Sequence, residues 1–180
     1  MALPSTVYKA AIQFSDIDRG IYETLQTTVA QHPSETAERL VTRLLAYLIF
    51  HEEGLTFTKG IGAADEPDLW LKGPDGRVRL WVEVGLPESD RIIKASRHSE
   101  KAVILACGKT LPNWEMQQLP KLNKLSNLTV KSLDHSFIND LASRLERFIT
   151  WSVTITEGTL YLSMANGTLQ TPILTKYGNY

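Results

Sequence analysis

Cysteine is almost absent from this 180-residue chain, and its absence excludes several classes of protein. Cys107 is the only cysteine, so neither an intramolecular disulfide nor a cysteine-based structural zinc site can form. A single thiol is typical of a reducing compartment, so we expect a cytoplasmic location. The histidines show no metal-ligand spacing: they are His32, His51, His98 and His135.

Long hydrophobic runs and an excess of charge of one sign are also missing. The longest strongly apolar segment, Leu44 to Phe50, is far too short to cross a bilayer, and nothing at the N-terminus resembles a signal peptide. We therefore expect no membrane partner. The net charge is −1 and the pI is near 6.4, so any binding of nucleic acid requires a local basic patch.

The composition that remains is that of an ordinary globular protein, with 43% hydrophobic and 22% charged residues. No repeat, low-complexity segment or linker divides the chain. We therefore expect a single domain over residues 1–180, large enough to bury a core without disulfides or metals.

Two strands and a helix are expected before residue 54. Alternating residues over 7–14 and 22–30 predict a hairpin. A helix then begins at Ser34, a good N-cap, and runs to about Glu53, where Gly54 ends it. Its apolar residues follow a helical period: Ala37, Leu40, Val41, Leu44, Leu45, Leu48 and Ile49.

Glu38 lies in the first turn of that helix and permits two interpretations. The preferred one is that it stabilises the helix dipole as a first-turn acid. In the other, its position on the same side as Val41 and Leu45 directs its carboxylate toward a site at the border of the apolar stripe.

The stretch from Glu66 to Gly85 predicts a second hairpin, around the loop Gly73–Gly76. With that loop, Asp68 lies opposite Trp81 and diagonal to Glu83, with Cβ atoms roughly 7 Å apart. Two carboxylates at that separation can share one divalent cation. Alternation assigns a core face to Leu69, Leu71, Val78, Leu80, Val82 and Val84, and the other face to Asp68, Trp70, Arg79, Trp81 and Glu83.

A helix capped by Ser89 or Asp90 and running to about Glu100 follows this hairpin. Arg91, Lys94 and His98 share one side of it. Further elements are expected as a buried strand over 101–107, a helix over 112–122, a strand over 128–131, a helix over 136–148 and strands over 152–156, 159–164 and 168–174, with a frayed tail after Lys176.

Residues 72–109 carry more basic than acidic side chains, which makes them the candidate contact for nucleic acid. Trp70 and Trp81 can stack on bases there, or they can lie in the core under a helix. Both alternatives remain open.

Two motifs resemble known families. Pro67-Asp68 and Glu83-Val84-Gly85 resemble the two elements of the PD-(D/E)XK nuclease superfamily. Over its whole length the chain is more closely similar to the YaeQ family of bacterial proteins. That resemblance rests on His32-Pro33-Ser34-Glu35-Thr36, Glu66-Pro67-Asp68-Leu69-Trp70, Trp81-Val82-Glu83-Val84-Gly85-Leu86-Pro87 and Arg91-Ile92-Ile93-Lys94-Ala95-Ser96.

The resemblance implies a mixed α/β (α+β) fold. Its restriction-endonuclease-like core, in the order αβββαβ, spans about residues 34–107, and hairpins are added at both termini. It implies Mg²⁺ or Mn²⁺ held by Asp68, Glu83 and Glu38. Gly85 occupies the position of the motif's lysine, and Lys94, in the following helix, is the residue that would replace it.

Three functions follow from these patterns. The first is metal-dependent hydrolysis of phosphodiester bonds in nucleic acid, with Asp68, Glu83, Glu38 and Lys94 as catalytic residues. The second is a nucleic-acid-binding module without catalysis. The third is a protein-interaction or regulatory domain on a degenerate nuclease fold, in which Asp68 and Glu83 only form salt bridges.

Overall fold

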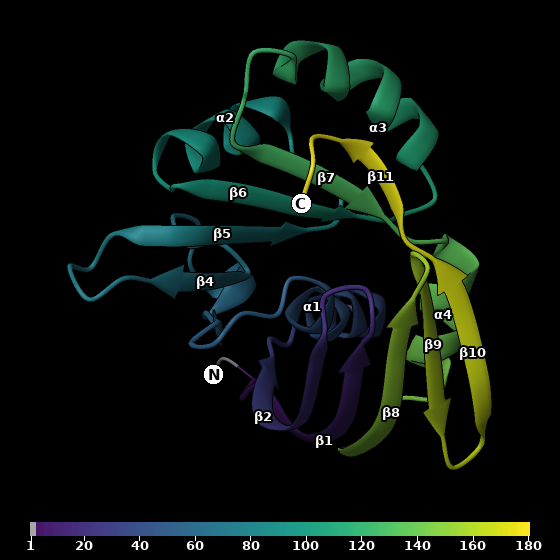
Figure 1. Cartoon of the computed structure of the whole chain (residues 1–180). Coiled ribbons are helices and arrows are strands. Elements are labelled where there is room, and N and C mark those ends of the chain that lie inside the picture. Colours follow the sequence, from purple (N-terminus) through teal and green to yellow (C-terminus); the bar gives the residue numbers. More distant parts are fainter. Residues whose placement is uncertain (1–2) are drawn as a thin grey trace.

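The computed structural model describes residues 3–180, which form two β-sheets and four α-helices (Figure 1). The expected mixed α+β composition is therefore confirmed. Both sheets combine parallel and antiparallel pairs of strands. Among these residues, no helix has the length and apolar character that crossing a membrane requires.

The first sheet joins the two ends of the chain. Its strand order is β10-β9-β8-β1-β2. β1 pairs with β2 in antiparallel orientation and with β8 in parallel orientation, so the expected N-terminal hairpin is confirmed and lies beside the C-terminal strands. The strands are β1 Thr6–Asp16, β2 Ile21–Gln31, β8 Phe148–Thr156, β9 Thr159–Met164 and β10 Gly167–Pro172.

The second sheet has the order β11-β7-β6-β5-β4-β3, and its three central strands run parallel to one another. The carboxyl ends of β5, β6 and β7 therefore meet at one edge of this sheet. Its strands are β3 Thr56–Phe57, β4 Leu69–Lys72, β5 Val78–Val84, β6 Lys101–Ala106, β7 Leu128–Ser132 and β11 Leu174–Tyr177.

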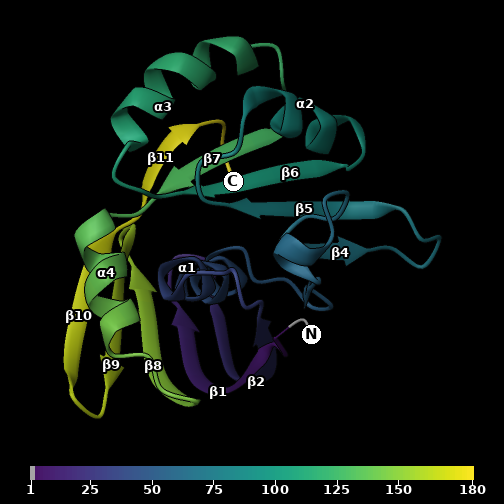
Figure 2. The same cartoon turned by 180° about the vertical axis from the view of Figure 1, so that it is seen from behind.

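Helix α1 lies between the two sheets, whereas α2 and α3 cover the outer face of the second sheet (Figures 1 and 2). The apolar residues of α1 pack in one core with residues of both sheets, and a second core lies beneath α2 and α3. The helices are α1 Ala37–Ile49, α2 Ser89–Arg97, α3 Leu111–Gln118 and α4 His135–Ser143, and the short 3₁₀ turns are η1 Gly60–Gly62 and η2 Leu119–Leu122.

The boundaries of α1 differ from the expected ones. Its N-cap is Thr36, whose hydroxyl accepts a hydrogen bond from the backbone N–H of Arg39 at 3.2 Å, and its C-cap is Phe50. Ser34 instead lies in a turn in which the N–H of Glu35 donates to the carbonyl of His32 at 2.8 Å. The helix therefore begins only after this turn, which buries the side chain of Glu35.

Three expectations further along the chain are also wrong. α2 ends at Arg97 instead of Glu100, and α4 ends at Ser143. Phe148 begins β8, where it pairs with Lys9 and projects from the outer face, so its helical spacing from Leu141 was coincidental. The C-terminal tail is ordered by side-chain hydrogen bonds, because the Tyr180 hydroxyl bonds to Phe50 and Glu52.

The β4–β5 hairpin has a register two residues away from the expected one. Trp70 pairs with Trp81, and a bulge follows between Leu71 and Lys72. A shift of two residues keeps each side chain on its expected face, because the period of a strand is two. Val78 is the exception: it lies beyond the bulge and packs against the second core instead of the first.

Because α1 lies between two sheets, we expect any substitution that leaves a cavity around it to lower the free energy of unfolding strongly. Leu44 is fully buried, so Leu44→Ala is expected to lower the free energy of unfolding by about 2–5 kcal/mol. The control is Met116→Ala on α3, where the side chain is 72% exposed and the expected change is within about 0.5 kcal/mol. Urea unfolding measures both, and equal effects would contradict the central position of α1.

Candidate functional site

Asp68 and Glu83 are brought together by the pairing of β4 with β5. Asp68 directly precedes β4, and its N–H donates to the carbonyl of Val82 at 3.0 Å. Since Leu69 pairs with Val82, the register carries Asp68 to a position opposite Glu83. Directly opposed residues have Cβ atoms about 4.5–5.5 Å apart, so the carboxylates lie closer together than the expected diagonal pairing would place them.

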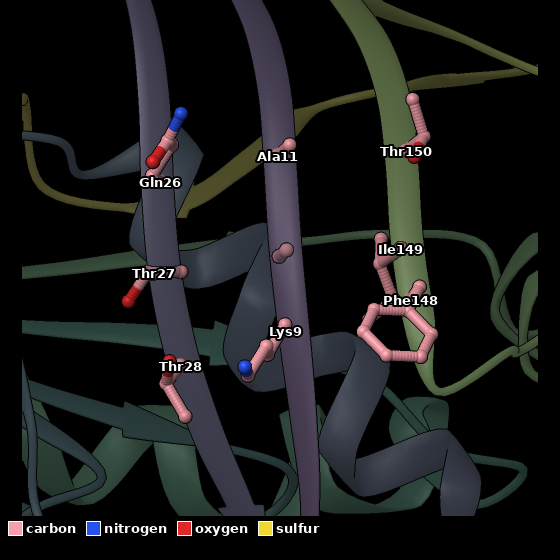
Figure 3. A pocket seen from close by; sticks show the side chains of 9 residues that line it. Lys9, Ala11, Gln26, Thr27, Thr28, Phe148, Ile149 and Thr150 are labelled. Carbon is pink, nitrogen blue, oxygen red and sulfur yellow. The ribbon is translucent and has the colours of Figure 1, made fainter.

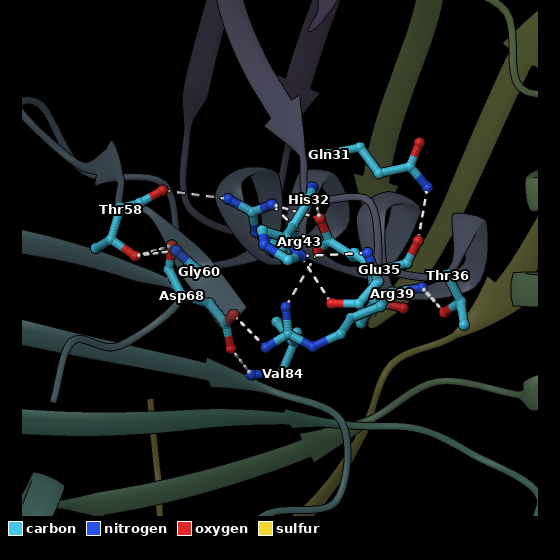
Figure 4. Close-up of polar contacts among 12 residues, drawn as sticks. Gln31, His32, Glu35, Thr36, Arg39, Arg43, Thr58, Gly60, Asp68 and Val84 are labelled. Atoms are coloured by element: carbon cyan, nitrogen blue, oxygen red, sulfur yellow. Dashed lines mark hydrogen bonds and ion pairs between the residues drawn. The ribbon is translucent and has the colours of Figure 1, made fainter. Parts of the chain in front are cut away.

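The carboxylate of Asp68 is almost completely buried and both of its oxygens are bound (Figure 4). Oδ2 accepts a hydrogen bond from the N–H of Val84 at 2.8 Å. Oδ1 accepts one from Nη2 of Arg39, which lies in the first turn of α1. Asp68 thus links β5 to α1 through one charged and one backbone donor.

Glu83 is also buried, with 2% of its surface exposed. Its Oε1 accepts a hydrogen bond from Nε1 of Trp81 at 2.8 Å and pairs with Nη2 of Arg91 at 3.0 Å. Burial, and secondly the nearby charge of Asp68, raise the pKa of Glu83 above its ordinary value despite these donors. The two carboxylates therefore repel each other at a place where a cation would be stabilised.

A cavity of about 440 Å³ opens above this pair. The side chains of Asp68 and Glu83 line it together with the guanidinium groups of Arg39 and Arg91. Its remaining walls are the η1 turn and the segment 84–87, at the carboxyl end of β5. Ligands of α/β sheets are commonly bound at this end of parallel strands.

Arg39 is held by a second buried acid that the sequence patterns did not identify. Glu35 accepts hydrogen bonds from Nη1 of Arg39 and from Nη1 of Arg43, both at 3.1 Å (Figure 4). Arg43 is 2% exposed and also donates to the carbonyls of Ala30 and Thr58. The spacing of four residues between Glu35, Arg39 and Arg43 was the available signal, because such residues are neighbours on a helix.

The other two expected site residues lie outside this cavity. Glu38 is exposed and lines a smaller neighbouring cavity. Lys94 is exposed on α2, where its Nζ pairs with Oδ1 of Asp65 at 2.7 Å. Within residues 3–180, no three His, Cys, Asp or Glu side chains are grouped closely enough to hold a metal ion, so Asp68 and Glu83 form a pair without Glu38.

Gly85 shows why the motif's lysine position carries no side chain. Its φ of 90° lies in the left-handed region, where residues with a Cβ atom are strained. The turn after β5 therefore favours glycine. The cation that reaches Glu83 from the following helix is Arg91, which is fixed by donating to the carbonyls of Ala64 and Glu66, each at 2.8 Å.

The two tryptophans offered for base stacking are in different environments. Trp81 is 6% exposed within the second core, so its ring is not available to a ligand. Trp70 is partly exposed, and the Lys72 ammonium lies 3.6 Å from the centroid of its ring. The hypothesis that both rings stack on bases therefore fails for Trp81.

A larger hollow of about 600 Å³ lies on the outer face of the first sheet (Figure 3). It is lined by Lys9 and Phe148 and by small or neutral side chains of β1, β2 and β8. No carboxylate, histidine or cysteine lines it, so the smaller cavity beside Asp68 and Glu83 is the better candidate for chemistry.

The raised pKa of Glu83 predicts a pH dependence of stability. The folded protein keeps this proton at pH values where the unfolded chain, with an ordinary pKa of about 4.3, has lost it. The free energy of unfolding therefore falls as the pH rises from that value through the raised pKa. Glu83→Gln removes the titration and keeps an acceptor for Trp81.

Urea unfolding across this pH range should show the variant gaining stability relative to the wild type as the pH rises. A difference between the two proteins that stays constant with pH would show that Glu83 titrates normally.

Comparison with known proteins matches nearly the whole chain to one family. The family model described as YaeQ protein matches residues 1–173. Proteins named uncharacterized protein YaeQ are similar to this chain: the one from Salmonella typhi is 37% identical over 94% of both chains, and the one from Escherichia coli K12 is 38% identical over 91% of both.

Two crystal structures of YaeQ proteins are similar to this structure. The protein from Pseudomonas syringae has a TM-score of 0.94 and 39% identity, with 99% of both chains covered. The protein from Xanthomonas axonopodis pv. citri has a TM-score of 0.94 and 34% identity, covering 97% of this chain and 99% of the other. The chain therefore belongs to the YaeQ family.

Proposed function

We propose that this protein is a metal-dependent phosphodiesterase that acts on nucleic acid in the cytoplasm. The observation that carries the proposal is the position of Asp68 opposite Glu83, at a cavity that two guanidinium groups also line. Metal-dependent hydrolysis of a phosphodiester uses charges of both signs: carboxylates hold the divalent cation, and fixed cationic groups stabilise the phosphate.

The order of elements supports assignment of about residues 34–107 to a restriction-endonuclease-like core of the PD-(D/E)XK superfamily. α1 is followed by β3, β4 and β5, then by α2 and β6. This is the expected order αβββαβ, with one acid before the second strand and another near the end of the third.

The donor set fits Mg²⁺ or Mn²⁺. Mg²⁺ is commonly held by one or two carboxylates, with waters and substrate phosphate completing its shell, so Asp68 and Glu83 suffice without Glu38. Within the described chain, Oε2 of Glu83 makes no hydrogen bond. A bound cation would lower the pKa of a coordinated water and neutralise charge on the phosphate.

The arginines supply the remaining charges. Arg39 occupies Oδ1 of Asp68 in this structure, so binding of a cation requires its guanidinium to leave that oxygen while it stays in the cavity. There it can hold a phosphate through paired hydrogen bonds. The guanidinium of Arg91 stabilises negative charge beside Glu83. Lys94 contributes an ammonium only if it leaves Asp65.

A specific observation also favours a second function, namely a binding or regulatory module without catalysis. Asp68 and Glu83 each already have an arginine partner. In a site that no longer binds metal, such arginines would neutralise the negative charge of the two carboxylates. In this case, Arg39 and Arg91 hold the fold together and do not bind phosphate.

Calorimetry with Mg²⁺ and Mn²⁺ separates the two functions. The phosphodiesterase predicts binding by the wild type and its loss in both Asp68→Asn and Glu83→Gln, because each variant removes one anionic ligand. Glu38→Gln is the control, since Glu38 lies in the neighbouring cavity, and we expect it to bind as the wild type does.

Oligonucleotide cleavage then tests catalysis, with at least a hundredfold loss expected in Asp68→Asn. Absence of metal binding both with and without an added oligonucleotide would reject the phosphodiesterase and favour the second function.

A further inference from the structure

A second, smaller cavity adjoins the one that contains Asp68 and Glu83. Its volume is about 190 Å³, and it shares Arg39, Val84 and Gly85 as common walls with the larger cavity. A ligand held beside Arg39 in the larger cavity therefore lies next to the smaller one.

The interior of the smaller cavity is mainly apolar. Ile138 of α4 and Cys107, directly after β6, form part of its walls. The polar atom of Thr42 is already used, because its hydroxyl donates to the carbonyl of Glu38 at 2.7 Å and lies 3.3 Å from Sγ of Cys107. An apolar group is stabilised in such a cavity, where few polar partners are available to a phosphate.

Gly85 lies on the boundary that the two cavities share. A Cβ atom built at this residue would meet no atom within 4 Å. The boundary between the cavities thus includes bare backbone with free space beside it, and a ligand can extend across it.

We propose that the smaller cavity binds one unpaired nucleobase of a strand whose phosphate lies beside Arg39. The assignment rests on the proposed function, and it specifies a substrate that is single-stranded or has one nucleotide turned out of its duplex. A volume of about 190 Å³ corresponds to about six waters of liquid, which is enough room for one base.

The difference in polarity between the two cavities determines which part of the nucleotide each one binds. The guanidinium groups of Arg39 and Arg91 attract the phosphate to the larger cavity. The apolar walls formed by Cys107 and Ile138 accept the base. Glu38 and His135, which also line the smaller cavity, offer polar contacts to the edge of the base.

The single cysteine provides a direct test. Cys107 is half-buried, so its alkylation by iodoacetamide reports whether the smaller cavity is filled. With Mg²⁺ present, a nucleoside 5′-monophosphate at ten times its dissociation constant should slow alkylation about tenfold, as mass action requires. Ribose 5-phosphate and inorganic phosphate should leave the rate unchanged. A short single strand should protect Cys107, and its fully paired duplex should not.

Filling the cavity gives an independent test. Cys107→Phe should weaken binding of the single strand at least tenfold, and Cys107→Ser, which leaves the space open, should weaken it less. The control is Met116→Phe on the exposed side of α3. If Cys107→Phe does not fold, the alkylation of the wild type still decides.

Two failures are distinguishable. Equal alkylation rates with nucleotide and ribose 5-phosphate, while Mg²⁺ still binds at Asp68 and Glu83, would overturn the base cavity alone. Loss of the metal site itself would overturn the proposed function.

Discussion

Arg39 makes the contact on which the site depends. Its guanidinium lies between the carboxylates of Glu35 and Asp68, which are 6% and 1% exposed. An unpaired charge in such surroundings costs several kcal/mol, so Arg39 helps to stabilise the burial of both acids. Arg43 pairs with Glu35 from its other side, which fixes the acid that orients Arg39. The start of α1 is thereby tied to the start of β4, and the cavity lies where these elements meet the end of β5.

The fold explains why the charges gather at this edge. α1 is enclosed by two sheets, and most residues of its middle turns contact apolar neighbours, with the buried pair of Arg43 and Glu35 as an exception. Its first two turns reach the place where the parallel strands β5 and β6 end, because Arg39 bonds to Asp68 there and Thr42 contacts Cys107. Charged side chains of α1, β4 and β5 therefore meet at this rim of a largely apolar layer. The two adjoining cavities lie along that rim, one lined by charges and one by apolar groups.

Local patterns predicted the elements better than their mutual positions. Hairpins and α1 were recognisable because their apolar residues recur with a period of two or 3.6. The register of β4 against β5 could not be predicted, because it depends on a bulge after Leu71 that no residue pattern indicates. The register differs from the expected one by two residues, so the side chains keep their predicted faces, and Asp68 lies directly opposite Glu83. The ion pair between Arg39 and Asp68 joins residues 29 positions apart, and sequence spacing reports only near neighbours.

The central claim is that Arg39 holds the place of a cation that binds between Asp68 and Glu83. The most direct measurement is anomalous scattering from crystals soaked in Mn²⁺ together with a short single-stranded oligonucleotide. We predict one anomalous peak within coordination distance of both carboxylates, with the Arg39 guanidinium turned away from Asp68 toward a phosphate. A structure with bound oligonucleotide but no such peak, and with Arg39 still paired to Asp68, would contradict the account.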